Sequence, residues 1–279
     1  MNSKGLQQIV PVIAMTLALA GCGGGGDIGS SSGANGSGSN GNGSSGGDSG
    51  GSTTTNASPG GIWRGTDSIS GLQVIGLVDE SGDFNFIRSD GVQYVGSATV
   101  STNTVTASFE GFVPLGDTFT DGSTHGTGNL SGTIQARTSI DLTSQFKTDN
   151  GSTSSGTLDL TFDTLYNRAS SLATLAGNFT SPSSGVVVTV SSNGTIFSQD
   201  ASTGCVINGT ASIINASYNA YHVEFTYASC TGQAAVLNGV QFAGLATLDN
   251  EVSPEQAVIG VTGTSSSAKY AVTLLLNRS

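Results

Sequence analysis

From residue 60 to its end, the chain consists of short segments in which apolar and polar residues alternate. A period of two places the apolar side chains on one face of a β-strand. Gly, Asn, Asp and Ser separate the segments, and these residues form tight turns. "DESGD" at 79–83, "SSNG" at 191–194 and "NASYN" at 215–219 are clear examples. Strands are predicted at 62–68, 71–79, 83–88, 92–101, 104–113, 125–136, 138–147, 154–163, 176–181, 185–191, 195–200, 205–214, 220–230, 239–249, 256–264 and 269–277.

The two halves of this region resemble each other. "GGIWRGTDSISGLQVIGLVDESGDFNFI" at 60–87 can be laid over "LAGNFTSPSSGVVVTVSSNGTIFSQD" at 175–200, so that Trp63 and Phe179 hold equivalent places. Each half ends on a strand of alternating apolar residues, "GTLDLTFDTLY" in the first and "KYAVTLLLN" in the second. This internal repeat indicates a duplication.

The repeat divides the folded part into a first β domain at 60–166 and a second at 167–279. "NRASSLATLAG" at 167–177 is helix-compatible and would link them. Each domain holds about eight strands, and a meander of that size closes well into a barrel, which removes exposed sheet edges. The predicted fold class is therefore all-β, with two tandem antiparallel eight-stranded barrel-like domains. A pair of β-sandwiches is the structural alternative.

Charge restricts the kinds of partner. The chain has 8 Lys and Arg against 19 Asp and Glu, and the basic residues are scattered singly. Without a basic patch to neutralise phosphates, nucleic acid is not expected as a partner. An acidic surface also disfavours docking on anionic lipid headgroups. Membrane association would therefore need a separate anchor.

The start of the chain contains sequence features expected of such an anchor. Residues 1–21 contain Lys4 and then an apolar run from Ile9 to Ala20, which is shorter than the ~20 residues of a membrane span and is typical of a secretory signal peptide. Leu19-Ala20-Gly21-Cys22 resembles the lipobox of bacterial lipoproteins. The resemblance implies that the signal is removed before Cys22 and that Cys22 carries palmitate-type acyl chains. Gly23, in place of Asp, implies the outer membrane, at the cell surface or on the periplasmic face.

Residues 22–59 are then expected to form a lipidated, disordered tether. The stretch from 23 to 59 is almost entirely Gly, Ser, Asn and Thr. Such a segment cannot bury enough apolar surface to offset the entropy of ordering it. A tether of this length and composition reaches roughly 33 Å.

With Cys22 lipidated, Cys205 and Cys230 remain as a pair, and export makes a disulfide between them the expectation. The "NASYN" turn lies almost midway between them. A strict register through this pair would set the apolar Tyr221–Tyr227 face opposite Asn208 and Thr210. A bulge, or a turn centred one residue away, would remove the conflict.

The folded part resembles lipocalin-like barrels and the barrels of factor H binding protein-type lipoproteins in strand count and in its tether. This implies binding rather than catalysis. The first hypothesis is a non-catalytic role at the cell envelope, either binding a protein, a glycan or a small apolar ligand or serving as a structural accessory to an envelope assembly. A carrier with a small apolar ligand inside one barrel is the alternative. An apolar pocket above ~300 Å³ would favour the carrier, and a filled core would favour surface binding.

Catalytic and metal-binding patterns are weak. His125 lies close to Asp121 and could mimic an acid–His pair, but a polar loop position is the simpler interpretation, and His222 is expected to face outward. No nucleophile elbow or zinc spacing occurs, and no metal or cofactor is expected. A hydrolase of envelope polymers would need paired carboxylates in a groove. The scattered acidic residues that could supply them are Glu110, Asp159, Asp163 and Glu224.

One segment departs from clean alternation. "FEGFVPLGDTF" at 109–119 has three Phe residues and a Pro near a strand end. It is expected to form either an exposed apolar loop that meets a partner or a flap over one barrel end. The candidate contact residues are Phe109, Phe112, Pro114 and Phe119.

Overall fold

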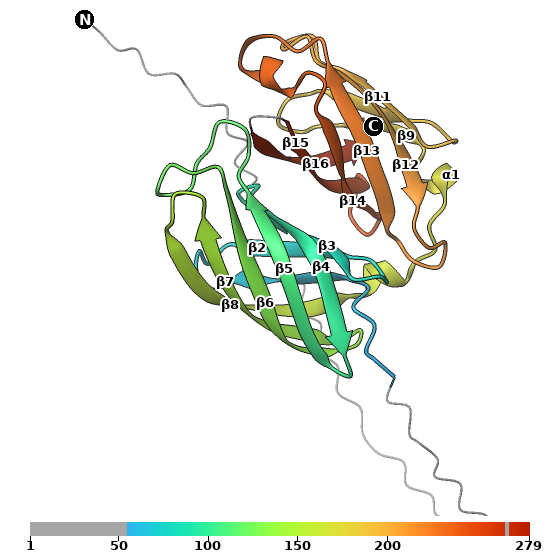
Figure 1. The fold of residues 1–279 in the computed structure, drawn as a ribbon. Helices are drawn as coiled ribbons and strands as arrows, with labels where there is room; N and C mark the ends of the chain where they lie inside the picture. The colour runs from blue at the N-terminus through green and yellow to red at the C-terminus, as the bar shows by residue number, and fades with distance from the viewer. Residues whose placement is uncertain (1–54, 266–267) are drawn as a thin grey trace, which may run out of the picture. The chain divides into compact units, whose positions relative to one another are not determined.

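The computed structural model describes residues 55–265 and 268–279, and it confirms the predicted fold class: these residues form two closed, eight-stranded antiparallel barrels. Figure 1 shows the first barrel in blue to yellow-green and the second in yellow to red. The signal peptide, Cys22 and the tether up to residue 54 lie outside the described residues. Within the described part, no helix is long and apolar enough to cross a bilayer.

Barrel 1 is a simple meander in which each strand pairs with the next and β8 closes on β1. Its strands are β1 (Gly61–Asp67), β2 (Gln73–Val78), β3 (Asp83–Arg88), β4 (Gln93–Ser101), β5 (Thr104–Phe112), β6 (His125–Gln135), β7 (Ser139–Thr148) and β8 (Thr153–Asp163). Trp63, the equivalent of Phe179, is fully buried inside it.

Barrel 2 repeats the meander after a linker that contains η1 (Thr164–Asn167) and α1 (Leu172–Leu175). Its strands are β9 (Gly177–Thr180), β10 (Val187–Val190), β11 (Thr195–Gln199), β12 (Val206–Ile213), β13 (Tyr221–Ala228), β14 (Gln241–Asp249), β15 (Gln256–Thr264) and β16 (Lys269–Arg278), with η2 (Gly232–Leu237) between β13 and β14. β16 closes on the short β9 through Asn277 opposite Thr180 and Arg278 opposite Phe179.

Glycines let aromatic rings fill barrel 1. Gly96, Phe109, Gly128 and Phe146 lie opposite one another on neighbouring strands. A Cβ atom at Gly128 would lie 2.3 Å from the Phe109 ring, so the ring occupies the space that a side chain would need. Glycines at such positions also allow the strands to bend as a barrel closes. The residual cavity in the centre of barrel 1 is only about 20 Å³, so its core is filled.

The chain enters barrel 1 at the end formed by the 79–82 and 136–138 turns. Ala57 N–H donates to Thr102 O at 2.7 Å, and Trp63 Nε1 donates to Pro59 O at 3.1 Å. Ser58 also donates to Glu80. The tether was predicted to extend to residue 59, whereas contacts with the barrel begin at Asn56. Sequence pattern did not reveal this because the contacts use backbone groups and small side chains.

Residues 56–279 belong to one compact unit, and the two barrels share buried contacts. Tyr166 of η1 stacks on Tyr218 with ring centroids 4.8 Å apart. Lys269 Nζ of barrel 2 donates to Glu110 Oε1 of barrel 1 at 2.5 Å. Gln93 Nε2 of barrel 1 donates to Thr273 Oγ1 of barrel 2 at 2.7 Å.

The β12–β13 hairpin resolves the predicted conflict of register. Ile207 pairs with Tyr227 and Ala211 with Val223, so apolar residues face one another across the hairpin. The register is shifted by one residue from a strict Cys205–Cys230 pairing, which is one of the two solutions that the sequence allows. The two cysteines nevertheless bond, as predicted, with a Cα–Cα distance of 4.0 Å.

Candidate functional site

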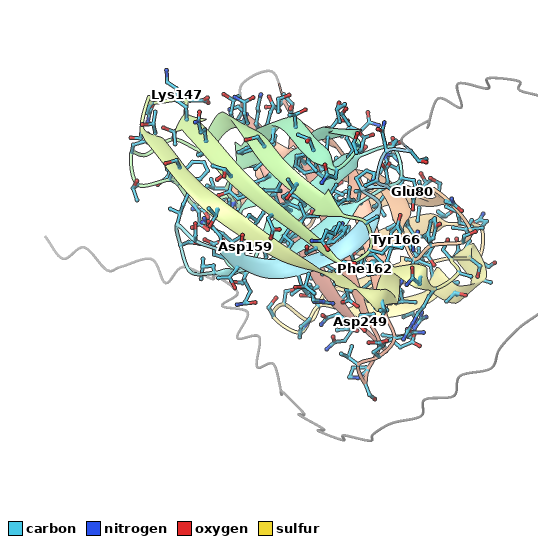
Figure 2. The ribbon with its side chains drawn as sticks, turned by 90° about the horizontal axis from the view of Figure 1, so that it is seen from below. Glu80, Lys147, Asp159, Phe162, Tyr166 and Asp249 are labelled. Carbon is cyan, nitrogen blue, oxygen red and sulfur yellow. A yellow bond between two sulfur atoms is a disulfide. The ribbon has the colours of Figure 1, made fainter. Side chains whose placement is uncertain are left out.

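The candidate site is the open end of barrel 1, opposite the end at which the chain enters. We define the barrel-1 mouth as the four loops 68–72, 89–92, 113–124 and 149–152, which join the strands at this end. Figure 2 shows Lys147, next to the mouth, at the far end of the barrel from Glu80 and Tyr166. Open barrel ends are frequent places for ligand sites, because loops there can vary while the strands hold them in place.

A cavity of about 600 Å³ lies within the mouth. The rings of Tyr94, Phe119 and Phe146 contribute to its walls, and Phe119 contacts Phe146 with ring centroids 5.2 Å apart. Ile69, on the rim, is 51% exposed, and Leu115 in the neighbouring loop is 42% exposed. Large apolar side chains exposed around an apolar cavity are typical of a binding surface.

A charged group lies at the side of this cavity. Arg88 donates from Nε and Nη2 to Asp90 at 2.9 and 2.6 Å, and from Nη1 to Asp67 at 3.2 Å and to the Tyr94 hydroxyl at 3.3 Å. Burial by itself would lower the pKa of Arg88, but the hydrogen bond to Asp90 and the nearby carboxylates raise it above its ordinary value. The guanidinium is therefore a permanent cation whose donors are already occupied, which leaves little capacity to bind an anion.

The pKa values of two neighbours of Arg88 are also shifted. Burial alone would raise the pKa of Asp90, but the hydrogen bond and charge of Arg88 lower it below its ordinary value. Burial raises the pKa of Tyr94, so its hydroxyl stays protonated near neutral pH. Asp67, Asp90 and Arg88 together carry a net negative charge.

Asp117 adds a further carboxylate. It lies in the 113–124 loop, is partly buried and lines the cavity. Its side chain makes no hydrogen bond or ion pair with any described residue, so its charge is uncompensated. Arg88 is the one basic residue among the described residues that line the cavity. The mouth therefore combines apolar walls with an excess of negative charge.

The predicted contact segment 109–119 is divided between core and mouth. Phe109 and Phe112 lie on β5 and are buried, so they are not part of an exposed loop. Phe109 packs inside barrel 1, and Phe112 contacts His125 with ring centroids 5.2 Å apart. Pro114 and Phe119 do line the mouth. The expectation of exposure is wrong for the first two residues, because both side chains pack against other residues of barrel 1 and are buried.

His125 pairs with a different carboxylate from the one suggested by sequence. Its Nδ1 lies 3.0 Å from Asp149 Oδ1, while its Nε2 lies 3.2 Å from Lys269 Nζ and 3.5 Å from Glu110 Oε1. Asp121 instead accepts hydrogen bonds from Ser123 and Thr148, which lower its pKa. Both nitrogens of His125 thus face charged groups, and no described hydroxyl is positioned as a nucleophile.

The other acidic candidates do not gather in one groove. Asp163 pairs with Arg64 at 2.5 Å, and Glu224 lies 3.9 Å from His222 on β13. Asp159 faces Asp141 across β7 and β8 on the outer surface of barrel 1. Among the described residues, no group of three or more His, Cys, Asp or Glu could hold a metal ion.

Two further hollows accompany the mouth. An open one of about 950 Å³ lies over the outer face of β4–β8, where hydroxyl and amide side chains such as Ser97, Asn129 and Gln145 are exposed. A smaller one of about 240 Å³ lies in barrel 2 and is treated below. The mouth differs from the outer hollow in its charged group, Arg88 with Asp90, and in the uncompensated Asp117.

Sequence reasoning missed Ile69, Arg88 and Asp117. "RSDG" at 88–91 was recognised as a turn, but its Arg could equally have been a solvated surface residue. Its meeting with Asp67 depends on the pairing of β1, β2 and β3. A run of apolar residues in loops is the one local signal that pointed to this end of the barrel.

Comparison with known proteins places this site in no established group. No protein-family model matches the chain, and no curated protein matches it either.

Proposed function

We propose that this protein is a lipid-anchored protein of the bacterial cell envelope that binds, without catalysis, an amphipathic molecule carrying a positive charge. The barrel-1 mouth is the binding site. The observation that carries the proposal is the cavity of about 600 Å³ whose apolar walls include an uncompensated carboxylate, Asp117.

The apolar part of the ligand would contact Phe119, Phe146 and the exposed rim at Ile69. Removing apolar surface from water stabilises such a complex by roughly 25 cal/mol per Å². Its cationic group would lie near Asp117, where partial exclusion of water strengthens the attraction between opposite charges. An anionic ligand would be repelled by the carboxylates of Asp90 and Asp117, and the bonds of Arg88 to Asp67 and Asp90 leave this cation little capacity to bind it.

The anchor would be Cys22, with the Gly- and Ser-rich stretch after it as the tether. The chain enters barrel 1 at the end opposite the mouth. Attachment through that entry leaves the mouth unobstructed by the tether, which supports a role in capturing ligands from the surroundings of the membrane.

A lipocalin-like carrier of an apolar ligand is the second candidate. The filled centre of barrel 1 argues against a ligand enclosed deep within that barrel. The mouth, by contrast, exceeds the ~300 Å³ typical of small-molecule sites. Binding at the mouth with partial exposure of the ligand therefore fits barrel 1 better than full enclosure.

The anchor is tested by expressing the full-length chain and Cys22→Ser in a bacterium fed with labelled palmitate. The expected result is label and detergent-phase partitioning for the native chain and neither for the variant. Protease added to intact cells then distinguishes the cell surface from the periplasmic face. An unlabelled native chain would refute the lipid anchor and leave the ligand site untouched.

The ligand site is tested by calorimetric titration with n-octylamine, n-octanol and n-octanoate, which share an apolar chain and differ in charge. We expect affinity to fall in that order. Asp117→Asn should weaken octylamine binding several-fold and leave octanol binding unchanged, since one exposed ion pair contributes about 0.5–1 kcal/mol. Asp141→Asn, on the outer surface, is the matched control and should change neither. Equal affinities for octylamine and octanoate would contradict the proposal.

A further inference from the structure

A second cavity lies inside barrel 2. Its volume is about 240 Å³, and the side chains of Val188, Ile207, Leu237, Leu274 and Leu276 form much of its wall. The inward-facing positions of β10, β12 and β16 supply four of these residues, and η2 supplies Leu237. An apolar cavity of roughly 150 Å³ in another protein takes up benzene. This cavity has room for a molecule of roughly ten heavy atoms.

One polar group points into this cavity. Tyr227 is an inward-facing residue of β13, its ring packs edge-on against Phe225 and Phe242, and it lines the cavity. Its hydroxyl makes no hydrogen bond with any described residue. Burial, with a smaller effect from the charge of Asp200, raises the pKa of the Tyr227 phenol to about 12. At neutral pH the hydroxyl is therefore an available donor.

The other polar groups near the cavity are already paired. Asp200 accepts from the hydroxyls of Ser202 and Thr203 at 2.7 Å each. Ser198 Oγ donates to Val187 O at 2.8 Å. The hydroxyl of Ser184, which also lines the cavity, accepts from Val186 N–H at 3.4 Å and is exposed to solvent. Among the partly or fully buried side chains of the wall, Tyr227 is therefore the one whose polar group has no partner among the described residues.

The 3-10 helix η2 forms a lid over this cavity. η2 covers it with Ala234 and Leu237, and the disulfide of Cys230 to Cys205 holds the chain just before η2. At the other end, Asn238 exchanges two hydrogen bonds with the backbone of Cys230, at 2.8 and 2.9 Å. Gly239 N–H, just after η2, donates to Tyr227 O of β13 at 2.9 Å, so both ends of the lid are attached to the barrel.

We propose that barrel 2 binds a small, largely apolar molecule with one hydrogen-bond acceptor, such as a ketone, which accepts from the Tyr227 hydroxyl. The apolar part of the molecule lies against the leucine and valine side chains. This site is separate from the barrel-1 mouth and does not depend on the function proposed for it.

The test uses acetophenone and ethylbenzene, which have nearly the same shape and differ in the acceptor oxygen. Their binding to the purified full-length protein is measured by calorimetry or by ligand-detected NMR. Because the ketone also loses its hydration on binding, the informative quantity is the ratio of acetophenone affinity to ethylbenzene affinity. We expect Tyr227→Phe to lower this ratio about three- to tenfold, as the loss of one hydrogen bond of about 1 kcal/mol requires, and to preserve ethylbenzene binding.

Filling the cavity provides an independent test. Val188→Phe and Ala234→Leu should each remove binding of both probes. Ala234 lies on the partly exposed lid, so its variant keeps the test decisive even where Val188→Phe fails to fold. Phe197→Leu changes an exposed residue of β11 and is the matched control, which should bind both probes normally. The proposal is overturned by an absence of binding to the native protein, by binding to the filled variants, or by a ratio of acetophenone to ethylbenzene affinity that is unchanged in Tyr227→Phe.

Discussion

Replacing Arg278 with Ala should destabilise barrel 2 more than any other single change to a surface cation. Arg278 lies where β16 meets the short β9, and only two residue pairs join these strands. Its guanidinium donates to Glu255 Oε2 at 2.5 Å, to Ala176 O at 2.6 Å and to Thr174 O at 2.7 Å. It also lies 4.7 Å from the centroid of the Phe179 ring. One side chain therefore holds the closing strand, the linker and the core together.

The magnitude follows from these contacts. Hydrogen bonds from a charged donor contribute about 1.5–3 kcal/mol when buried, and the 25% exposure of Arg278 reduces each of the two bonds to carbonyls to about 1 kcal/mol. The half-screened pair with Glu255 adds about 0.5 kcal/mol, and the contact with Phe179 adds about 0.5 kcal/mol. The expected loss is about 3 kcal/mol.

Urea unfolding followed by circular dichroism measures this loss. Arg168→Ala is the matched control, because Arg168 makes a single ion pair, with Glu251, and the two side chains are 35% and 54% exposed. Its expected cost is below about 1 kcal/mol. Arg278→Lys should recover part of the loss, since it keeps the charge but not the forked geometry. Equal costs for Arg278→Ala and Arg168→Ala would refute the reasoning.

Three further changes have predictable effects. The folded-state pKa of the Tyr227 phenol is raised, so its contribution to stability is present below pH ~10 and is lost as pH rises through about 12. Urea unfolding at alkaline pH should show this loss in the native chain and not in Tyr227→Phe. The variant should also lack one late step in a titration followed by tyrosinate absorbance. The pKa of Asp90 is lowered by Arg88, so its contribution is present above the unfolded value of 3.8 and is lost as pH falls below it; the urea midpoint of Asp90→Asn should therefore change less than that of the native chain between pH 5 and 2. Asp159→Asn should raise the free energy of unfolding by about 0.2–1 kcal/mol, because Asp141 lies directly opposite, and an unchanged or lower value would contradict this.

Alternation of residues predicted the strands well because it reports a local property. On β13, Tyr221, Val223 and Phe225 are buried and the residues between them are less so, as a period of two requires. Turn residues then determine which strands are joined into hairpins. In a meander, neighbours in sequence are neighbours in space, so local signals were sufficient to predict two eight-stranded barrels.

Alternation failed to predict burial where residues of barrel 2 cover outward-facing positions of barrel 1. Asn85, Ile87, Gln93 and Phe112 occupy outward-facing positions of barrel 1 and are nonetheless buried. Ile87 belongs to a cluster with residues of barrel 2, and Gln93 bonds to Thr273, which is 180 residues away in sequence. No alternation within one strand can report such contacts between the two barrels.

The candidate sites show the same difference between what local sequence and what tertiary contacts determine. The sequence by itself determined the strands, the turns, the two tandem barrels and the pairing of Cys205 with Cys230, since each depends on residue types at short or repeated spacing. Only the tertiary structure decided that Asp117 stays unpaired beside an apolar cavity and that Tyr227 points beneath η2. Both sites depend on which side chains from separate strands and loops fail to find a partner, and that is known only when every neighbour is in place.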